Sequence, residues 1–291
     1  MLERSVCEAA FAKINLHLRV GKKRTDGFHS IESVFQSISI ADVLQVRAAA
    51  AFSVKCLNFA LPSENSLKKA YTVFCKATGF NKGVEVLLLK RIPACAGLGG
   101  ASTDAVALLR ALQRLSGIQL SEAECARLAL EVGSDCPFFV RGGAAFVTGR
   151  GEMIKPLTAK KAIGLLIFPK TESKTTEAYA LLDMERAKRS AECTATTVAP
   201  PEADALCAVY EKWNVCKENP HFVNDFEHIM TQRLPEVREA RSALLEAGAG
   251  FVRITGSGSA VFGLFESEKT LQAAIKTLKM RFSFCEPFLF C

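Results

Sequence analysis

The stretch RIPACAGLGGASTDAVALLRALQRL, residues 91–115, decides the fold because a glycine-rich turn here joins a strand end to a helix. Gly97, Gly99 and Gly100 let the backbone approach a ligand closely. Apolar residues then recur at helical spacing, which predicts a helix from about Ser102. The free N–H groups at a helix N-terminus bind anions, above all phosphate. A turn that only connects strand and helix explains the glycines alone equally well, and the stretch matches neither a Walker loop nor GxGxxG.

The composition is typical of a soluble globular enzyme. The 291 residues suffice for one large domain or two ordinary ones, and 49% of them are apolar and 23% charged. No apolar run reaches the ~18 residues that span a bilayer. Residues 1–15 lack the order of a signal peptide, because Lys13 interrupts the apolar part. We therefore expect a cytoplasmic protein without a membrane partner.

The eleven cysteines and four histidines do not predict a metal site. The cysteine count is odd, no CxxC pair occurs and the histidines lack metal-ligand spacing, so the sequence identifies no metal ligand. We interpret the cysteines as small core residues of a reduced protein. Cys95, in the glycine loop, is the cysteine that we expect to be accessible.

The net charge of +7 indicates an acidic partner. Part of the excess is local, because basic residues crowd the first predicted hairpin: Lys13, Arg19, Lys22, Lys23 and Arg24. Such a cluster can also be a plain solvated face. Aromatic residues are not interleaved with the basic ones, so we expect no nucleic-acid partner. A small phosphorylated substrate explains the charge.

Two pairs of residues near the N-terminus are candidate ligand contacts. Residues 9–20 alternate apolar and polar side chains, which predicts a half-buried strand with Lys13 and Asn15 on one face. Lys13 is either an ordinary strand lysine facing water or, together with Asn15, a contact for an anionic ligand. Phe28 and His29 follow a predicted turn and are either ligand contacts or a plain turn-flanking pair.

Asp135 stands between a helix-ending glycine and a Pro-Phe-Phe run. A carboxylate in apolar surroundings needs a partner or a raised pKa, and both are typical of a working acid or base. The residue pattern supports equally a structural role, in which Asp135 caps a short helix that begins at Pro137.

A new succession of predicted strands and helices begins at about residue 160, so we predict two domains, residues 1–158 and 159–291. In the second domain the order of strands and helices suggests a split βαβ arrangement, with a loop over residues 186–202. Two predicted strands flank the stretch TGSGS at residues 255–259. Both glycine-rich loops offer backbone N–H groups and hydroxyls, which can bind phosphate without a Walker lysine.

Together these stretches resemble the GHMP kinase superfamily. The strand with Lys13 and Asn15 resembles its first motif, PACAGLGGASTDA at residues 93–105 its ATP-phosphate loop, and ITGSGSAV at residues 254–261 its third motif. Within the superfamily, the stretches AKINLHLRVGKKRTDGFHSIESVFQSI, GSDCPF and NDFE are similar to the kinases that act on 4-diphosphocytidyl-2-C-methyl-D-erythritol. The resemblance spans residues 9–265, with the motifs in the same order.

The resemblance implies an α+β fold of two domains with the active site in the cleft between them. The N-terminal domain would be an α/β domain of βαβ type and the C-terminal domain ferredoxin-like. The implied activity is ATP-dependent phosphorylation of the substrate's 2-hydroxyl in the non-mevalonate isoprenoid pathway, with Mg²⁺ bridging the phosphates. By the matched positions, Asp135 is the base near the attacking hydroxyl and Lys13 its charged partner. The implied substrate-binding residues are Asn15, Phe28, His29, Thr175 and Tyr179. The implied ATP-binding residues are Asn65, Ser66, Pro93, Ala94, Cys95, Ala96, Gly97, Leu98, Gly99, Gly100, Ala101, Ser102, Thr103, Gly256 and Ser257.

The sequence departs from the usual GGLGGGSS loop of this family at three positions. Ala96 and Ala101 replace glycines, and Thr103 replaces a serine. Alanine is acceptable where φ is negative, so we expect the loop backbone to keep the curved conformation that contacts the phosphates. Phe28 stands where tyrosine is usual, which keeps the stacking on cytosine but loses a hydroxyl.

Two alternative functions are compatible with parts of this pattern. Another small-molecule GHMP kinase, of the homoserine or mevalonate type, would share the motifs but not the resemblance around His29. A non-catalytic binding protein, for RNA for example, would use the same scaffold and tolerate the loss of the Asp135 carboxylate. For the assembly, we expect a monomer or a weak homodimer that binds a small-molecule substrate.

Overall fold

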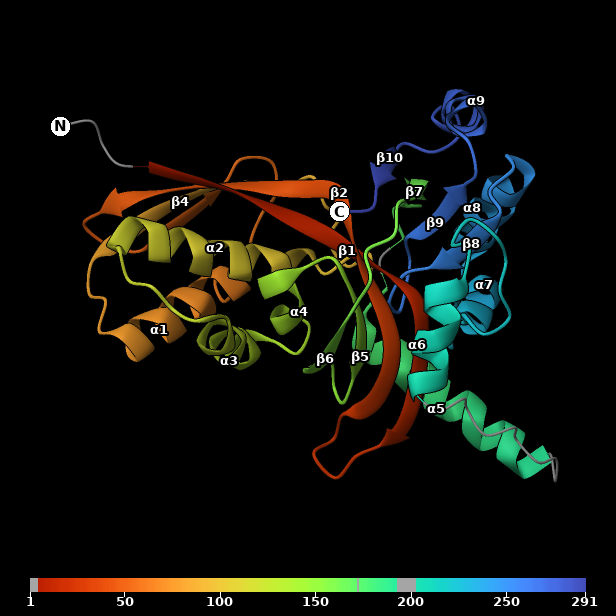
Figure 1. Cartoon of the computed structure of the whole chain (residues 1–291), viewed down its shortest axis with the longest axis horizontal. Coiled ribbons are helices and arrows are strands. Elements are labelled where there is room, and N and C mark those ends of the chain that lie inside the picture. Colours follow the sequence, from red (N-terminus) through yellow and green to blue (C-terminus); the bar gives the residue numbers. More distant parts are fainter. Residues whose placement is uncertain (1–4, 172, 193–202) are drawn as a thin grey trace.

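Two β-sheets and their helices make up the part of the chain that the structure describes, residues 5–171, 173–192 and 203–291 of a computed structural model (Figure 1). The first sheet contains β1 (Ser5–Lys23), β2 (His29–Ala49), β3 (Ser53–Cys56), β4 (Gly83–Leu89), β5 (Ala144–Thr148) and β6 (Met153–Leu157). Its helices are α1 (Ser66–Thr78), α2 (Gly100–Ser116), α3 (Glu122–Val132) and α4 (Cys136–Arg141). The second sheet contains β7 (Ile163–Ile167), β8 (Phe251–Ile254), β9 (Val261–Phe265) and β10 (Cys285–Leu289). The helices of this second part are α5 (Thr175–Glu192), α6 (Ala203–Lys212), α7 (Glu227–Arg233), α8 (Pro235–Glu246) and α9 (Glu268–Leu278).

The first sheet is built around the long hairpin of β1 and β2. β2 pairs with β1 along one edge; along the other edge it pairs with β5 through residues 33–36 and with β4 through residues 43–49. The helix α2 packs on β1 and β2, with α1 and α3 beside it. Register shifts in β1 directly before Lys13 and directly after Asn15 interrupt the simple alternation of a strand. Both side chains are buried, at 3% and 2% exposure.

Two predictions about helices differ from the structure. The phosphate-loop helix α2 begins at Gly100 rather than near Ser102. The predicted loop over residues 186–202 is wrong for residues 186–192, which continue α5, because Ala, Lys, Arg and Glu in this segment are good helix formers. Residues 193–202 lie outside the described part. Within the described residues, we find no helix with the length and apolar character that crossing a membrane requires.

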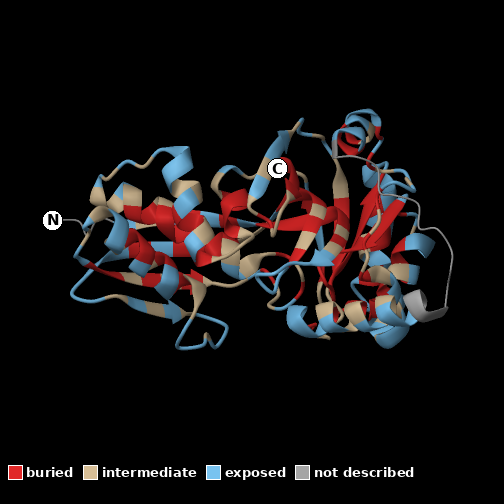
Figure 2. Cartoon of the chain, turned by 90° about the horizontal axis from the view of Figure 1, so that it is seen from below, coloured by how far each residue is buried: buried red, intermediate tan, exposed pale blue. Residues whose placement is uncertain are grey.

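The second sheet has the strand order β10-β7-β9-β8 and is antiparallel throughout, which is the ferredoxin-like order that the resemblance implied. The helices α8 and α9 pack against its strands. A hydrophobic cluster also joins the two sheets, since it contains Ile14 and Leu16 of β1 together with Phe251 and Phe262 of the second sheet. Buried residues accordingly run without a break from one sheet to the other (Figure 2). A domain boundary after residue 158 stays a prediction.

Candidate active site

A cavity of about 640 Å³ lies between the two sheets and receives residues from both halves of the chain. Its wall contains Lys13 and Asn15 from β1, the connection before α1, the glycine loop before α2, Asp135, the first turns of α5, and the turn between β8 and β9. The predicted residues in the wall are Lys13, Asn15, Asn65, Ser66, Pro93, Ala94, Cys95, Ala96, Gly97, Leu98, Gly99, Gly100, Ala101, Ser102, Asp135, Thr175, Tyr179, Gly256 and Ser257. Segments far apart in the sequence thus form one site.

The glycine loop curves into α2 through two left-handed glycines. Gly97 has φ +79° and Gly99 φ +71°, values that favour glycine. Neither Ala96 nor Ala101 has a positive φ, so both alanines fit the curve as expected. Cys95 has φ +53° and is exposed at the cavity wall, which confirms that this cysteine is accessible. The interpretation of the other cysteines as core residues is wrong for Cys7 and Cys291, which are exposed too because they lie near the two ends of the chain.

The two glycine-rich loops contact each other directly. The Thr255 hydroxyl donates a hydrogen bond to the Gly97 carbonyl at 3.0 Å, and the Ala260 N–H donates to the Ala96 carbonyl at 3.3 Å. A Cβ on Gly97 would lie 2.0 Å from the Thr255 carbonyl oxygen, so only glycine permits this approach. The loops therefore form a single unit at one end of the cavity.

Lys13 is a buried cation beside the double glycine loop, the unit formed by residues 93–100 and 255–259. Its Nζ donates to Asn15 Oδ1 at 2.7 Å, lies 3.7 Å from Asp135 Oδ2, and sits 4.6 Å from the ring centre of Phe35. Burial lowers the pKa of Lys13, and the charge of Asp135 offsets this only in part. The interpretation of Lys13 as a water-facing lysine is wrong, because it is 3% exposed.

Asp135 stands at the N-cap position of α4, where its sequence context suggested a helix cap, but its side chain makes no capping hydrogen bond. Instead the carboxylate, with its side chain 35% exposed, lines the cavity and faces the ammonium of Lys13. The carboxylate is thus left free to meet a ligand.

Both polar atoms of the Asn15 side chain are engaged in hydrogen bonds within the protein. Its Oδ1 accepts hydrogen bonds from Lys13 Nζ and from the Gly256 N–H at 2.8 Å, and the Thr255 hydroxyl oxygen lies 3.2 Å away. Its Nδ2 donates to the Ser33 hydroxyl at 2.9 Å. Asn15 therefore ties the cation to the second glycine turn, in addition to lining the cavity.

The remaining wall residues sit at helix N-termini. Asn65 is the N-cap of α1 and accepts a hydrogen bond from the Lys68 N–H at 3.0 Å. Thr175 begins α5, and the Ser257 hydroxyl approaches its hydroxyl at 3.4 Å. Tyr179 follows one turn later in α5.

Three predicted residues do not line the cavity: Phe28, His29 and Thr103. Thr103 is buried within α2. The ring centres of His29 and Tyr179 lie 5.0 Å apart, and His29 Nε2 lies 2.9 Å from Asp183 Oδ1, so His29 lies directly behind the wall. Phe28 is 52% exposed with the Arg150 guanidinium 4.9 Å from its ring centre.

Lys90, Asp42 and Asp104 form a buried ionic cluster that sequence reasoning missed. Lys90 Nζ contacts Asp42 Oδ2 and lies 2.8 Å from Asp104 Oδ2, and both Lys90 and Asp104 line the cavity. Burial raises the pKa of Asp104 to about 7, although Lys90 opposes the rise, and its Oδ1 has no hydrogen-bond partner among the described residues. The cluster places an ammonium beneath Gly100, where a Cβ would lie 3.2 Å from Lys90 Nζ. A lysine therefore sits beneath the loop, supplied by the end of β4 rather than by the loop's own sequence.

The comparisons with known proteins agree with this geometry. The model of the GHMP kinases N terminal domain matches residues 65–143, and that of the GHMP kinases C terminal matches residues 222–282. The 4-diphosphocytidyl-2-C-methyl-D-erythritol kinase of Treponema pallidum strain Nichols is 41% identical over 97% of both chains. That of Thermotoga maritima is 36% identical over 89% of this chain and 92% of its own.

Solved structures give the same family. A crystal structure of 4-(cytidine 5′-diphospho)-2C-methyl-D-erythritol kinase matches with a TM-score of 0.80 and 30% identity over 98% of this chain and 99% of its own. Homoserine kinase from Cytophaga hutchinsonii matches with a TM-score of 0.72 over 100% of this chain and 96% of its own; at 18% identity, this likeness concerns the fold alone. With the double glycine loop, the buried Lys13 and the facing Asp135 in one cavity, the chain belongs to the 4-diphosphocytidyl-2-C-methyl-D-erythritol kinase family of the GHMP kinases.

Proposed function

We propose that this protein uses ATP to phosphorylate the 2-hydroxyl of 4-diphosphocytidyl-2-C-methyl-D-erythritol, giving the 2-phosphate and ADP in the non-mevalonate pathway. The observation that carries the proposal is the Lys13–Asp135 pair, which shares one cavity with the double glycine loop. The loop and the N-terminus of α2 provide an anion site for the ATP phosphates. The pair provides a base and a cation at the reacting end.

The reaction follows from these positions. The hydroxyl oxygen of the substrate attacks the γ-phosphorus, the bond from that phosphorus to the oxygen bridging the β-phosphate breaks, and ADP leaves. Asp135 takes the hydroxyl proton, and the Lys13 ammonium, 3.7 Å from the carboxylate, is the neighbouring cation. The same ammonium stabilises the negative charge of the transferred phosphoryl group.

A magnesium ion fits the donor set of the cavity. Magnesium at a nucleotide keeps several waters and is bound largely by the phosphates, so few protein oxygens would be needed. In this proposal the Ser102 hydroxyl, which lies in the wall, would supply a protein oxygen. When bound, the ion cancels charge on the β- and γ-phosphates.

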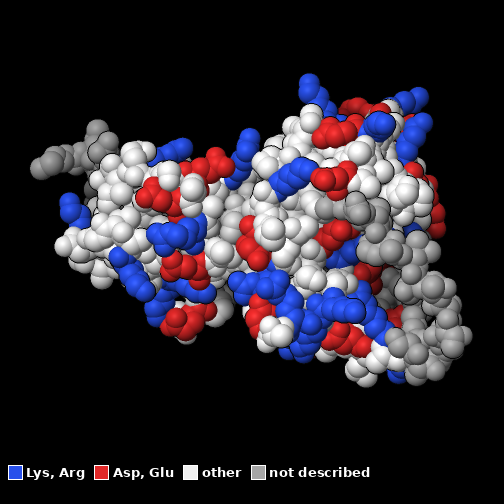
Figure 3. All heavy atoms as spheres, turned by 60° about the horizontal axis from the view of Figure 1, so that its bottom comes forward, with Lys and Arg blue, Asp and Glu red and all other residues white. Residues whose placement is uncertain are grey.

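The cytidyl end of the substrate is proposed to bind along α5 and the tip of the first hairpin. Thr175 and Tyr179 lie in the wall, with His29 behind Tyr179 and the exposed Phe28 ring beyond it. Basic side chains gather, with acidic ones among them, on the face that carries this hairpin (Figure 3). This charge suits an approaching diphosphate, and nucleic acid is not needed to account for it. A cytoplasmic location and a monomer or weak homodimer belong to the same proposal.

A coupled ADP-release assay with the cytidyl substrate tests the proposal on the wild type and on Asp135→Asn. Asparagine keeps the shape of the side chain but cannot take the proton, so we expect turnover to fall by at least ~10², with ADP binding retained. Phosphorylation of homoserine or mevalonate but not of the cytidyl substrate would contradict the substrate assignment. Unchanged turnover in Asp135→Asn, with salt-sensitive RNA binding, would instead support a non-catalytic binding protein.

A further inference from the structure

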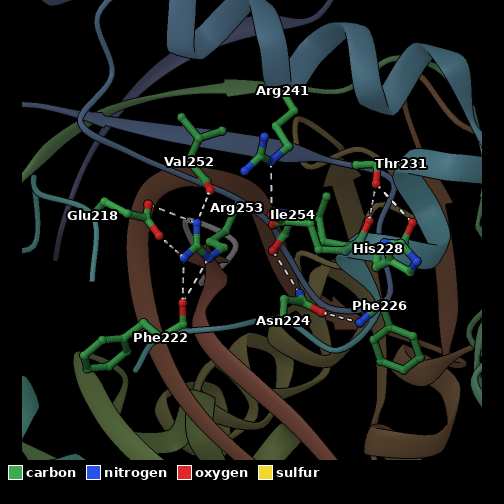
Figure 4. Close-up of polar contacts among 11 residues, drawn as sticks. Glu218, Phe222, Asn224, Phe226, His228, Thr231, Arg241, Val252, Arg253 and Ile254 are labelled. Carbon is green, nitrogen blue, oxygen red and sulfur yellow. Dashed lines mark hydrogen bonds and ion pairs between the residues drawn. The ribbon is translucent and has the colours of Figure 1, made fainter. Parts of the chain in front are cut away.

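Asn224 lies outside the cavity wall but is bonded to the second glycine turn on both sides of Thr255. Its Nδ2 donates hydrogen bonds to the Ile254 carbonyl at 3.0 Å and the Gly256 carbonyl at 2.9 Å, and its Oδ1 accepts from the Phe226 N–H at 2.9 Å. Figure 4 shows the amide of Asn224 between Phe226 and Ile254. At 7% exposure, the side chain is committed to holding the turn.

The direction of the Gly256 carbonyl determines the direction of the next N–H. A trans peptide unit is planar, so its C=O and N–H point in opposite directions. With the Gly256 carbonyl turned toward Asn224, the Ser257 N–H points the other way, at a position where Gly256 and Ser257 line the cavity. Among the described residues this N–H has no hydrogen-bond partner, whereas the Gly256 N–H is already donated to Asn15 Oδ1.

The segment that carries Asn224 is anchored at both ends. Arg253 Nε and Nη2 donate to the Phe222 carbonyl at 3.0 and 2.7 Å (Figure 4). Glu227 Oε2 accepts a hydrogen bond from the Ile254 N–H at 3.2 Å. The segment also pairs with β1, because the Leu18 N–H donates to the Val223 carbonyl at 2.7 Å. A side chain held this firmly can impose one orientation on the turn.

We propose that Asn224 is a positioning residue of the phosphate site, which holds the Gly256 carbonyl so that the Ser257 N–H donates to an anionic phosphoryl oxygen in the cavity. The inference rests on the proposed function for the identity of that ligand. The phosphoryl oxygen belongs either to the nucleotide or to the diphosphate of the cytidyl substrate. ADP and CDP separate these two sources.

Asn224→Asp tests the positioning role. Aspartate has the same shape and still accepts from the Phe226 N–H, but it sets an oxygen against the two carbonyl oxygens that Nδ2 now bonds. We expect the turn to reorient, with kcat/KM lower by about 10²-fold, the effect of losing one preorganised N–H donor. Asn219→Asp is the matched control, because Asn219 Oδ1 accepts from the His221 N–H at 3.0 Å and, among the described residues, its side chain makes no hydrogen bond to the turn.

Calorimetric binding of ADP and of CDP identifies the ligand. Weakening of ADP binding alone by about tenfold or more in Asn224→Asp assigns the N–H to the nucleotide, and weakening of CDP binding alone assigns it to the substrate's diphosphate. Binding of both ligands at wild-type affinity in Asn224→Asp overturns the proposal, as does an equal loss in Asn219→Asp. Failure of the wild type to phosphorylate the cytidyl substrate would overturn the proposed function and leave these binding results in place.

If Asn224→Asp does not fold, the proposed role of the Ser257 N–H can be tested on the wild-type protein. In a sample labelled with ¹⁵N-serine, the Ser257 amide signal is assigned by its absence in Ser257→Ala. We expect this signal to shift when either ADP or CDP saturates the site. A signal that moves with neither ligand overturns the proposal.

Discussion

Replacing Gly97 with alanine should separate the two glycine-rich loops and reduce catalysis. A Cβ at this position would lie 2.0 Å from the Thr255 carbonyl oxygen, whereas an ordinary contact begins at 3.4 Å. The loops would have to move apart by about 1.4 Å, the difference between these two distances. A misplacement of about 1 Å in a catalytic arrangement costs roughly 10²-fold in rate. We therefore expect kcat/KM to fall about 10²-fold.

A second glycine provides the control for backbone strain. Gly97 has φ +79° and Gly117, at the far end of α2, has φ +78°, so alanine at either position costs about 1–2 kcal/mol of folding free energy. A Cβ on Gly117 meets no atom within 4 Å. Gly117→Ala should therefore lower stability without lowering kcat/KM.

Steady-state kinetics and thermal unfolding of both variants decide between strain and misplacement. We expect the strain to lower both unfolding midpoints by several degrees, but only Gly97→Ala to lose activity. The reasoning would be refuted by a Gly97→Ala enzyme within threefold of wild-type kcat/KM. An equal loss of kcat/KM in Gly117→Ala would refute it as well.

Three further predictions concern buried or exposed titratable groups. Burial raises the pKa of Asp104 to about 7, so the folded state holds a proton that the unfolded chain loses near pH 4. The free energy of unfolding should therefore decline as the pH rises from about 4 through 7. Urea unfolding of Asp104→Asn from pH 4 to 8 should lack this decline. Burial lowers the pKa of Lys13, so its charged form opposes folding. Calorimetry should therefore give Lys13→Met a higher unfolding midpoint than the wild type at pH 7, although the variant should lose its turnover. N-ethylmaleimide should label the exposed Cys95 thiol more slowly when ADP is bound, as read by peptide mass mapping.

Each of these three experiments has an opposite outcome that contradicts it. A wild-type decline in stability that persists unchanged in Asp104→Asn would place the titrating group elsewhere. A lower unfolding midpoint in Lys13→Met would mean that its ion pair with Asp135 outweighs the cost of burial. Labelling of Cys95 at the same rate with and without ADP would separate this thiol from the nucleotide site.

The local parts of the site could be predicted from the sequence because their signals are local. Glycine spacing followed by helical periodicity indicated the loop and α2, and the helix begins within two residues of the predicted start. The contact between the Thr255 hydroxyl and the Gly97 carbonyl could not be predicted, because it joins residues 158 positions apart. The cluster of Asp42 with Lys90 was missed for the same reason, since 48 positions separate them and neither belongs to a motif.

Side-chain environment was harder to predict than secondary structure. Alternation along the first strand placed Lys13 and Asn15 on one face, but it could not show whether that face meets water. The glycine loop covers Lys13, since a Cβ on Gly99 would lie 3.3 Å from its Cγ, and the turn between β8 and β9 covers Asn15 through the Gly256 N–H. Asp135 illustrates the same limit, because the N-cap position was readable from the sequence while the direction of its carboxylate was not.

The long strand β1 restricts how the cavity can open. Ile14 and Leu16 belong to the hydrophobic cluster that contains the inner face of the second sheet, while the same strand pairs with β2 along its whole length. Any opening of the cavity about residues 158–162, the connection between β6 and β7, would have to expose these buried apolar side chains to water. An inhibitor can therefore be designed to contact both sheets at once, because Lys13 and Asn15 of β1 and Gly256 and Ser257 of the turn between β8 and β9 line the same cavity.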